Sequence, residues 1–388
     1  MIGCFFQEQA SLLQQRYDVR VLFGISRPFS YLSALRQYRL FPWYGHACVK
    51  LVRADIIPTP PPVTAFEYNH MSFGEPALLA STIDAYRQMF NHLITEGWRP
   101  NILHAHATDA AGIIASRLSH EFKIPWVLTE HQVFALANYS EHRRRLMTEA
   151  LLTATKLVAV SSHQLRSIAV HGIYRPIVVM GNLIDEEVFY LAESRRDPAQ
   201  FRILTVTYPS PVKDCETFFH AIALLINRGH PDIMVTVIGN NSFDDLSRAN
   251  TEEFERLAEK FGVEKVCRLI AHVPRSEMHK FYAECDVFVS TSVAETFGVS
   301  VREAMAVGRP AVCTASGGVE DDLSQVNGVK VGIGDYEAVA DALISIKTGC
   351  LNFDPVSVRN SVVDKHGRQA FLDQMTGVYE DVMIYNQM

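Results

Sequence analysis

The sequence predicts an α/β protein with two domains, each built on a parallel sheet covered by helices on both faces. The chain has 388 residues, more than a single hydrophobic core normally serves. Short runs rich in Val and Ile recur along it, and a helical pattern follows each run. This alternation breaks once, between residues 181 and 200, where the sequence is polar and has no strand pattern. We therefore place the domain boundary in this segment.

The expected strands fall into two groups, one on each side of the boundary. A strand of a parallel sheet is buried on both faces and is therefore mostly apolar. The first group comprises residues 19–23, 102–105, 126–128, 157–161 and 177–180, and the second comprises 203–206, 233–238, 287–290 and 311–313. We expect an N-terminal domain over residues 1–185 and a C-terminal domain over residues 196–365.

The two ends of the chain carry helical patterns. Residues 357–388 are expected to form a helix, with apolar side chains at Phe371, Met375, Val378 and Val382. We expect its part from 370 to 388 to pack back on the first domain. Near the start, residues 5–15 read as a helix followed by a strand, but no strand precedes this helix. Because a doubly wound domain usually opens with a central strand, the first domain is expected to lack its opening strand.

Composition excludes several classes of protein. Hydrophobic residues make up 48% and charged residues 20% of the chain, a balance typical of globular proteins. The net charge of -7 gives no electrostatic reason to expect a nucleic-acid partner. The seven cysteines are widely spread, which indicates thiols in a reducing compartment. We find no apolar run of about 18 residues and no signal-peptide pattern, so we expect a cytoplasmic protein.

Residues 286–312 carry the most informative pattern: a strand, a polar loop, a glycine, a helix and a Gly-Arg-Pro turn. A helix that starts at Gly298 or Val299 presents free backbone N–H groups and a positive dipole end, which suit a diphosphate. Glu295 and Glu303 lie eight positions apart, and carboxylates accept hydrogen bonds from paired sugar hydroxyls. Taken alone, such a pair of acids is more often simply solvated.

This segment resembles the retaining glycosyltransferases of family 4, also called glycosyl transferases group 1. Their signature is Glu, seven residues, Glu, written here Glu295-TFGVSVR-Glu303. Further similar segments follow one another in the expected order: GCFFQEQASLL, HAHATDAAG, PWVLTEH, LVAVSSHQL, GNLIDEEVF, SGGVEDDL and NGVKVGIGD. The resemblance implies the GT-B fold, in which two Rossmann-like doubly wound domains face a central cleft. It also implies a hexosyltransferase that retains anomeric configuration and needs no metal or cofactor, with a nucleotide-diphosphate sugar as its substrate.

The same resemblance assigns roles to the signature residues. Glu295 is expected to bind hydroxyls of the donor sugar, and Glu303 the ribose of the nucleotide. The backbone amides of Phe297, Gly298 and Val299 are expected to hold the diphosphate.

Four further residues belong to the expected donor side. Lys213 matches the family lysine that neutralises the leaving phosphate. Gly317 and Gly318 match a pair of glycines near the donor, although a plain tight turn explains them almost as well. Tyr208 stands where the family has an arginine, and it can donate a hydrogen bond but supplies no charge.

The acceptor side is expected to use residues of the first domain. His131 matches a histidine beside the reaction centre, and His106 and Asp109 match positions that line the acceptor. In the family a glycine-bearing loop near the start of the chain contacts the acceptor, and Gly3 is the residue of this chain that corresponds to it. His104 and His106 also have the i, i+2 spacing of metal ligands. A zinc site needs three or four ligands, however, and we predict no metal.

The expected partners are a nucleotide-sugar donor and a glycan or lipid-linked acceptor, in polysaccharide or glycolipid biosynthesis. Residues 34–50 interleave basic and aromatic side chains, which suits peripheral contact with a membrane or an ordinary surface loop. Contacts to the base are expected in loops such as IGNNS and AHVPRS, which contains His272.

Two alternatives remain open at this stage. One is a catalytically weak or inactive homologue that acts as a partner subunit, because the opening strand and the arginine are missing. The other is a different nucleotide-using enzyme, such as a dehydrogenase or an epimerase. No G-x-G-x-x-G follows any expected strand, which argues against a nicotinamide enzyme.

Overall fold

The computed structural model divides the chain into two compact units, which are described here one at a time. It describes residues 4–28, 48–51, 63–70, 74–191, 200–239 and 244–385. The C-terminal unit comprises residues 160–165 and 180–371, and the N-terminal unit comprises residues 2–159, 166–179 and 372–388. Contacts thus group residues 160–165 and 180–185 with the C-terminal unit.

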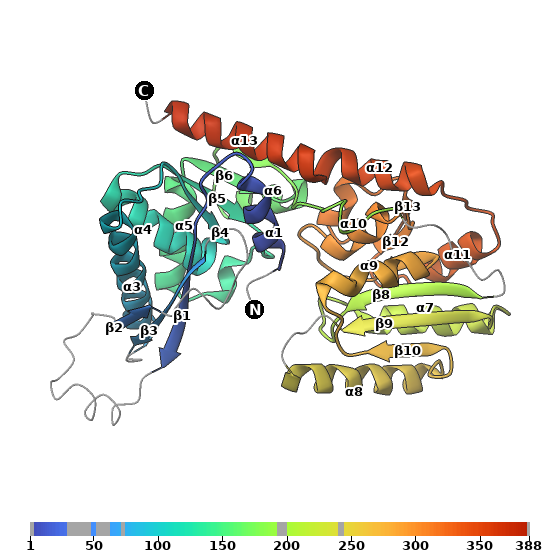
Figure 1. Cartoon of the computed structure of the whole chain (residues 1–388). Helices are drawn as coiled ribbons and strands as arrows, with labels where there is room; N and C mark the ends of the chain where they lie inside the picture. The colour runs from blue at the N-terminus through green and yellow to red at the C-terminus, as the bar shows by residue number, and fades with distance from the viewer. Residues whose placement is uncertain are drawn as a thin grey trace. The chain divides into compact units, whose positions relative to one another are not determined.

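A six-stranded parallel sheet forms the centre of the C-terminal unit, and β8, β9 and β10 can be seen side by side in Figure 1. The strand order is β10-β9-β8-β11-β12-β13, and all neighbours are parallel. The strands are β8 (Phe201–Thr207), β9 (Ile233–Gly239), β10 (Cys267–Ile270), β11 (Val287–Ser290), β12 (Ala311–Thr314) and β13 (Gly328–Val331). The order reverses between β8 and β11, and open α/β sheets bind their ligands beyond the carboxyl ends of the strands at such a reversal.

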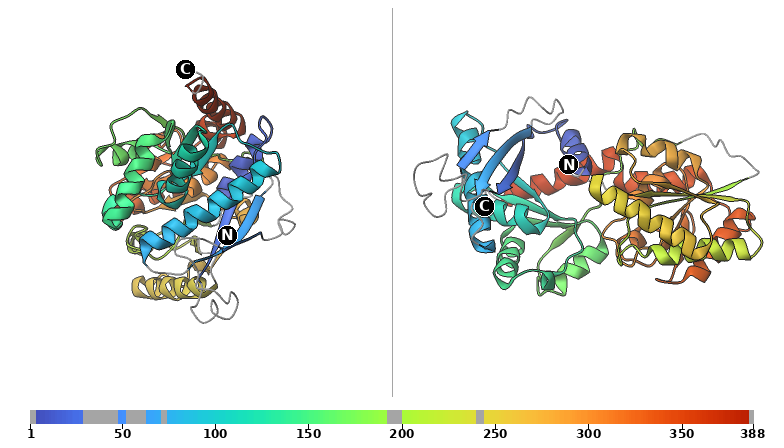
Figure 2. Two further views of the ribbon diagram at one scale, coloured as in Figure 1. Left: turned by 90° about the vertical axis from the view of Figure 1, so that its left-hand side faces the viewer. Right: turned by 90° about the horizontal axis from the view of Figure 1, so that it is seen from below.

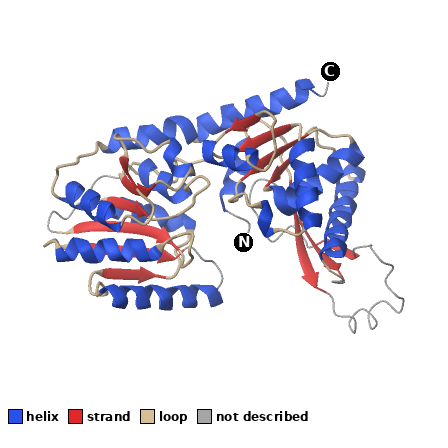
Figure 3. Ribbon diagram, turned by 180° about the vertical axis from the view of Figure 1, so that it is seen from behind, coloured by secondary structure: helices blue, strands red, loops and turns tan. Residues whose placement is uncertain are grey.

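Helices cover both faces of this sheet, as Figure 3 shows from behind. Successive side chains of a strand point to opposite faces, so one strand supplies both cores. Val235 and Val237 pack on one side, while Ile238 and Phe288 pack on the other. The first core includes α7 (Cys215–Asn227), α8 (Asp244–Phe261) and α11 (Tyr336–Lys347), and the second includes α9 (Arg275–Glu284), α10 (Val299–Ala306) and α12 (Pro355–His366).

The N-terminal unit contains two separate sheets. The four-stranded sheet is parallel, with the order β4-β5-β6-β7, and the three-stranded sheet has the order β1-β3-β2. The strands are β1 (Val21–Pro28), β2 (Cys48–Leu51), β3 (Val63–His70), β4 (Leu103–His106), β5 (Trp126–Glu130), β6 (Lys156–Ala159) and β7 (Ile177–Val179). Within the described residues, no strand pairs with both β1 and β4, so the two sheets stay separate.

The described residues of this unit also form the α-helices that accompany these sheets, and the ribbon can be followed by its colours in Figure 2. They are α1 (Cys4–Leu13), α3 (Glu75–Thr95), α4 (Ile113–Phe122), α5 (Glu141–Thr153), α6 (Ser162–Ala169) and α13 (Arg368–Tyr385), of which α6 and α13 also have residues in the C-terminal unit.

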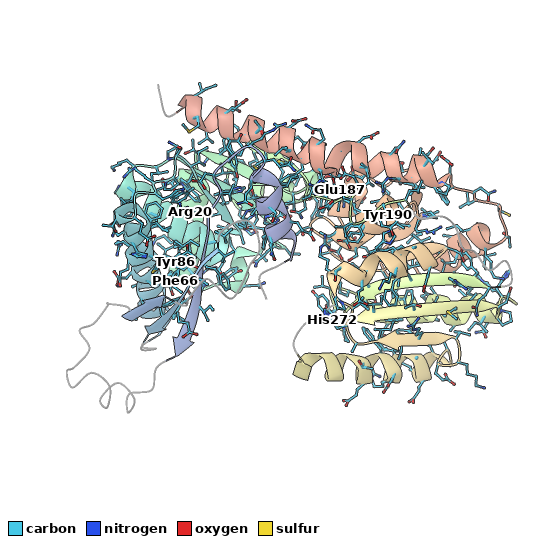
Figure 4. The ribbon with its side chains drawn as sticks, in the orientation of Figure 1. Arg20, Phe66, Tyr86, Glu187, Tyr190 and His272 are labelled. Atoms are coloured by element: carbon cyan, nitrogen blue, oxygen red, sulfur yellow. The ribbon has the colours of Figure 1, made fainter. Side chains whose placement is uncertain are left out.

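Close packing between β1, β3 and α3 explains one glycine of the N-terminal unit. The backbone N–H of Gly24 donates to Tyr86 Oη at 3.0 Å. The rings of Phe66 and Tyr86, labelled in Figure 4, meet edge to face with centroids 5.0 Å apart. A Cβ at position 24 would lie 2.8 Å from Phe66 and 2.9 Å from Tyr86, so any larger residue would push the strand away from the helix.

The expected strands are present, with ends shifted by up to five residues, but four strands were missed: β2, β3, β10 and β13. β3 and β13 interleave charged or polar residues with apolar ones, and β10 carries an arginine, so none of these three strands gives a continuous apolar run. The single helix expected over residues 357–388 was also wrong. The chain forms α12 and α13, which Gly367 separates with an extended ψ of 171°.

We predict that Phe219→Ala destabilises the C-terminal unit by about 3–5 kcal/mol, because it leaves a cavity among buried side chains. Phe219 is 0% exposed and packs beside Phe218 and Phe254. Urea unfolding followed by far-UV circular dichroism measures the change. Ile333→Ala is the control, since Ile333 is 49% exposed and its truncation is expected to change stability by less than about 0.5 kcal/mol. A loss below about 1 kcal/mol in the Phe219 variant would contradict the assigned core.

Candidate functional site

Lys213 and Glu295 meet where the loops after β8 and β11 diverge. Their side chains form an ion pair and are 17% and 16% exposed, respectively. Ser292 Oγ also donates to Glu295 Oε1 at 2.8 Å. Lys213 directly precedes Asp214, the N-cap of α7, whose carboxylate accepts from Thr217 Oγ1 at 2.7 Å. The helix cap therefore fixes the backbone that carries the lysine, and a cation and an acid stand together at the carboxyl ends of the strands.

The amino end of α10 lies in the same loop and offers free hydrogen-bond donors. The helix begins at Val299, as the sequence predicted, and Gly298 precedes it with a φ of 73°. The amides of Phe297, Gly298 and Val299 donate to no group within the described residues. Aligned amides at a helix start carry partial positive charge, so this site is suited to bind an anion.

The paired glycines pack directly against the signature loop. Gly318 N donates to the carbonyl of Glu295 at 2.8 Å, and Glu295 N donates to Ser316 O at 2.8 Å. A Cβ on Gly318 would overlap the carbonyl group of Thr296. Gly317 has a φ of 101°, a conformation that side chains disfavour. Close approach of two backbones thus requires the glycines, beyond any need for a tight turn.

Glu303 is placed differently from its partner in the signature. It is 2% exposed, forms an ion pair with Arg275, and accepts a hydrogen bond from Tyr282 Oη at 2.9 Å. Burial, and then the charge of Glu303, raises the pKa of Tyr282 well above its usual value, so the phenol stays protonated and donates. Arg275 belongs to the segment AHVPRS, in which contacts to the base are expected, but its pairing with Glu303 was not predicted. Tyr282 was missed because α9 has no recognisable motif.

Tyr208 and His272 also belong to this edge of the sheet. Lys213 Nζ lies 5.4 Å from the centroid of the Tyr208 ring, a cation–π contact. Tyr208 therefore contacts the lysine and holds no charge of its own. His272 is exposed in the loop after β10 and is labelled in Figure 4.

In the N-terminal unit, the predicted residues His106 and His131 form a hydrogen-bonded pair. His106 Nδ1 and His131 Nε2 lie 2.9 Å apart, and the Phe6 ring packs on both, with centroid distances of 4.8 and 4.9 Å. Burial lowers the pKa of His106 to about 4, so this imidazole is neutral at pH 7. A neutral His106 shares an N–H···N hydrogen bond with His131, and this bond helps to orient the His131 ring.

His104 stacks on His106 and does not complete a metal site. The two rings lie 4.3 Å apart, and the nitrogens of His104 bond to Tyr379 Oη at 2.7 Å and Thr129 Oγ1 at 2.8 Å. In the part of the chain that the structure describes, no group of three or more His, Cys, Asp or Glu side chains is placed to hold a metal.

Glu130 organises the loops around the histidine pair and was missed in the sequence. It is buried at the end of β5, where its carboxylate accepts from the amides of His131 and Gln132 and from Thr108 N, each at 2.8 Å. Next to Thr108, Ala107 adopts a φ of 74°, which is uncommon for a residue with a side chain. Such strain persists only where surrounding bonds enforce it, and Glu130 supplies one of them, beside the bond from Ala107 N to the carbonyl of Thr129 at 2.8 Å.

Asp109 is engaged by a cation. Its two carboxylate oxygens accept from Arg143 Nε at 2.5 Å and Nη2 at 3.0 Å, and Arg143 also pairs with Glu75 at 3.2 Å. The remaining predicted acceptor residue, Gly3, lies outside the described residues, as does most of the segment 34–50.

A parallel sheet whose diverging loops present a lysine, an acid and the amides of a helix start defines an α/β protein with a site suited to bind an anion at its strand ends. Comparison with family models identifies the family. The model of Glycosyltransferase Family 4 matches residues 10–188, and the model of Glycosyl transferases group 1 matches residues 189–349. The chain belongs to the family 4 glycosyltransferases.

Curated relatives are similar over part of their length. The D-inositol 3-phosphate glycosyltransferase of Corynebacterium jeikeium (strain K411) is 25% identical over 245 residues, which cover 58% of this chain and 58% of the relative. The probable sucrose-phosphate synthase 1 of Oryza sativa subsp. indica is 24% identical over 326 residues, which cover 64% of this chain and 30% of the relative.

Solved structures establish the fold as GT-B. Sucrose-phosphate synthase from Thermosynechococcus elongatus superposes with a TM-score of 0.75 at 16% identity, covering 98% of this chain and 93% of that one. HepE from Anabaena, solved with UDP and glucose, gives a TM-score of 0.70 at 17% identity, covering 97% and 96%. None of the helices in the described residues has the length and apolar character needed to cross a membrane.

We predict that the burial of His106 makes stability depend on pH. Because the pKa of the folded protein is about 4 and that of the unfolded chain about 6.5, the unfolded state binds the proton first as pH falls. Stability is full above pH 6.5 and declines toward pH 4, by on the order of 1–3 kcal/mol for this group. Urea unfolding at pH 7.5, 6 and 5 should show a smaller decline in His106→Asn than in wild type.

The matched control is His120→Asn, which removes an exposed histidine of α4. It is expected to leave the pH profile as in wild type. Equal profiles for His106→Asn and wild type would show that the buried histidine does not titrate as described.

Proposed function

We propose that this protein is a retaining glycosyltransferase that transfers a sugar from a nucleotide diphosphate to a glycan or lipid-linked acceptor, in polysaccharide or glycolipid biosynthesis. The observation that carries the proposal is the ion pair of Lys213 and Glu295 beside the free amides at the start of α10. Membership of the family supports it, as do relatives named for sugar transfer to inositol phosphate and a similar fold solved with UDP-glucose.

On this proposal the diphosphate binds to the amides of Phe297, Gly298 and Val299. Its charge draws Lys213 from Glu295, which frees the carboxylate to accept hydrogen bonds from the donor sugar. As the bond to the sugar breaks, negative charge grows on the departing phosphate, and the lysine and the helix terminus stabilise it from fixed positions. The protein thus lowers the barrier by electrostatics placed in advance.

The nucleoside end is proposed to lie over Glu303. Since Arg275 and Tyr282 already bind this carboxylate, the ribose must share it with them or displace the guanidinium. The ion pair therefore sets part of the cost of binding the nucleotide.

The acceptor hydroxyl is proposed to approach the side of His131, which neutral His106 holds in orientation. Attack from the face that the diphosphate leaves retains the anomeric configuration without a covalent intermediate. The reaction is proposed to need no metal, and to take place inside the cell.

Two observations favour a second function. Glu303 is buried against Arg275 and Tyr282, and Tyr208 supplies no charge, which suits a homologue that binds donors weakly and serves as a partner subunit.

We predict that purified protein slowly hydrolyses at least one nucleotide sugar from a panel of UDP-, GDP- and ADP-sugars. Glu295→Gln and Lys213→Met should each lower this turnover about 100- to 1000-fold, because each removes a group that acts on the developing charge or its sugar. Release of nucleoside diphosphate, followed by liquid chromatography, measures the rate. Lys260→Met is the control, since Lys260 forms a comparable but exposed pair with Glu216.

EDTA should leave the rate unchanged, and nuclear magnetic resonance of the product formed with the preferred acceptor should show the anomeric configuration of the donor. Binding of nucleoside diphosphates without turnover of any donor would favour the partner subunit. If the protein neither binds nucleoside diphosphates nor turns over any donor, a donor site in this loop is ruled out.

A further inference from the structure

A buried arginine lies beside the diphosphate seat, the name used here for the amides of Phe297, Gly298 and Val299 to which the proposed function assigns the diphosphate. Arg302, in the first turn of α10, is 1% exposed. Its Nη2 donates to the carbonyl of Gly318 at 3.0 Å, and its guanidinium carbon lies 3.9 Å from the centroid of the Phe297 ring. One side chain thus contacts both segments that shape the seat, the loop before α10 and the glycine pair.

One nitrogen of this guanidinium has no hydrogen-bond partner among the described residues. Arg302 Nη1 is buried and donates to no group in the described part of the chain. Buried donors in native proteins are nearly always bonded, so an exception calls for an explanation such as a ligand or a water. A Cβ built on Gly298 would lie 3.7 Å from Nη1, which places this donor directly behind the residue whose amide is also free.

The charge of Arg302 is held in place by a shared counter-ion. Arg302 Nε donates to Asp322 Oδ2 at 2.7 Å, and the same carboxylate accepts from His366 Nε2 at 2.7 Å and Lys365 Nζ at 3.0 Å. Burial raises the pKa of Asp322, but the hydrogen bond from His366 and the charge of Arg302 outweigh it and keep the pKa well below its usual value. Asp322 therefore stays ionised under Arg302. His366 in turn meets the Phe297 ring edge-on, with centroids 5.1 Å apart.

We propose that Arg302 is a positioning residue for the diphosphate: it locks the Phe297–Gly298 turn to Gly318 and keeps the Nη1 donor for the bound anion, reached directly or through one water. This inference rests on the proposed function, because the anion is the diphosphate of the donor. It assigns to the side chain of Arg302 part of the stabilisation that backbone amides and Lys213 alone would otherwise supply.

A purely structural ion pair and a positioning residue respond differently to removal of both partners. Replacing a buried pair by apolar side chains of similar size is often neutral or stabilising, whereas removing one partner leaves a buried charge. We therefore expect Arg302→Met/Asp322→Leu to melt within a few degrees of wild type but to bind the anion poorly. Arg302→Lys keeps a charge and loses the planar fork that reaches Gly318 and the seat together.

The experiment is isothermal titration of wild type and both variants with UDP, ADP, GDP and inorganic pyrophosphate, with melting temperatures measured in parallel. We expect at least tenfold weaker binding of pyrophosphate and of the preferred nucleoside diphosphate in both variants. Lys347→Met/Asp232→Leu is the matched control, since it replaces an ion pair of the same unit, with nitrogen and oxygen 2.7 Å apart, by the same apolar residues. It should bind like wild type.

The outcomes separate this inference from the proposed function. If wild type binds none of the four ligands, both the inference about Arg302 and the proposed function are rejected. If wild type binds and the double variant binds within twofold of it, the inference alone is overturned. Should the double variant fail to fold, Arg302→Lys decides: weaker binding at an unchanged melting temperature supports the inference, and wild-type binding overturns it.

Discussion

The amino end of α10 is the physical constraint on which the site depends. A helix start leaves backbone donors without partners, and here they point into the loop that also holds Glu295. The reversal of strand order between β8 and β11 brings the loop of Lys213 to the same place. Gly298 and Gly318 make the arrangement possible, because any side chain at either position would collide with a neighbouring segment.

Much of this could be predicted from the sequence, because it depends on local patterns. Continuous apolar runs gave most strands of the parallel sheets, and the glycine before Val299 gave the start of α10. The strands that were missed carry charged or polar residues, and their burial is decided by neighbours distant in the chain. The break at Gly367 likewise involves residues distant in the chain, because Ile184 N donates to the carbonyl of His366 at 2.9 Å and Arg368 N donates to Glu186 Oε2 at 2.8 Å.

The partners of the signature residues could not be predicted for the same reason. Glu303 owes its burial to Arg275 and Tyr282, which lie more than 20 positions away on another helix. Arg302 stands inside the signature, yet its sequence position shows neither the pairing with Asp322 nor the donor left without a partner. In the N-terminal unit, the orientation of His131 comes from Glu130 and His106, a relation that depends on loop conformation.

On the proposed function, the ion pair of Lys213 and Glu295 also bears on selectivity. A lone phosphate that bound the lysine would take the counter-ion from the glutamate, which would keep the hydrogen bond from Ser292 but lose its neutralising charge. A free sugar that bound the glutamate would in the same way leave the lysine without its counter-ion. A molecule that carries a diphosphate and sugar hydroxyls together can engage both side chains at once, so the ion pair favours an intact sugar donor over phosphate or sugar alone.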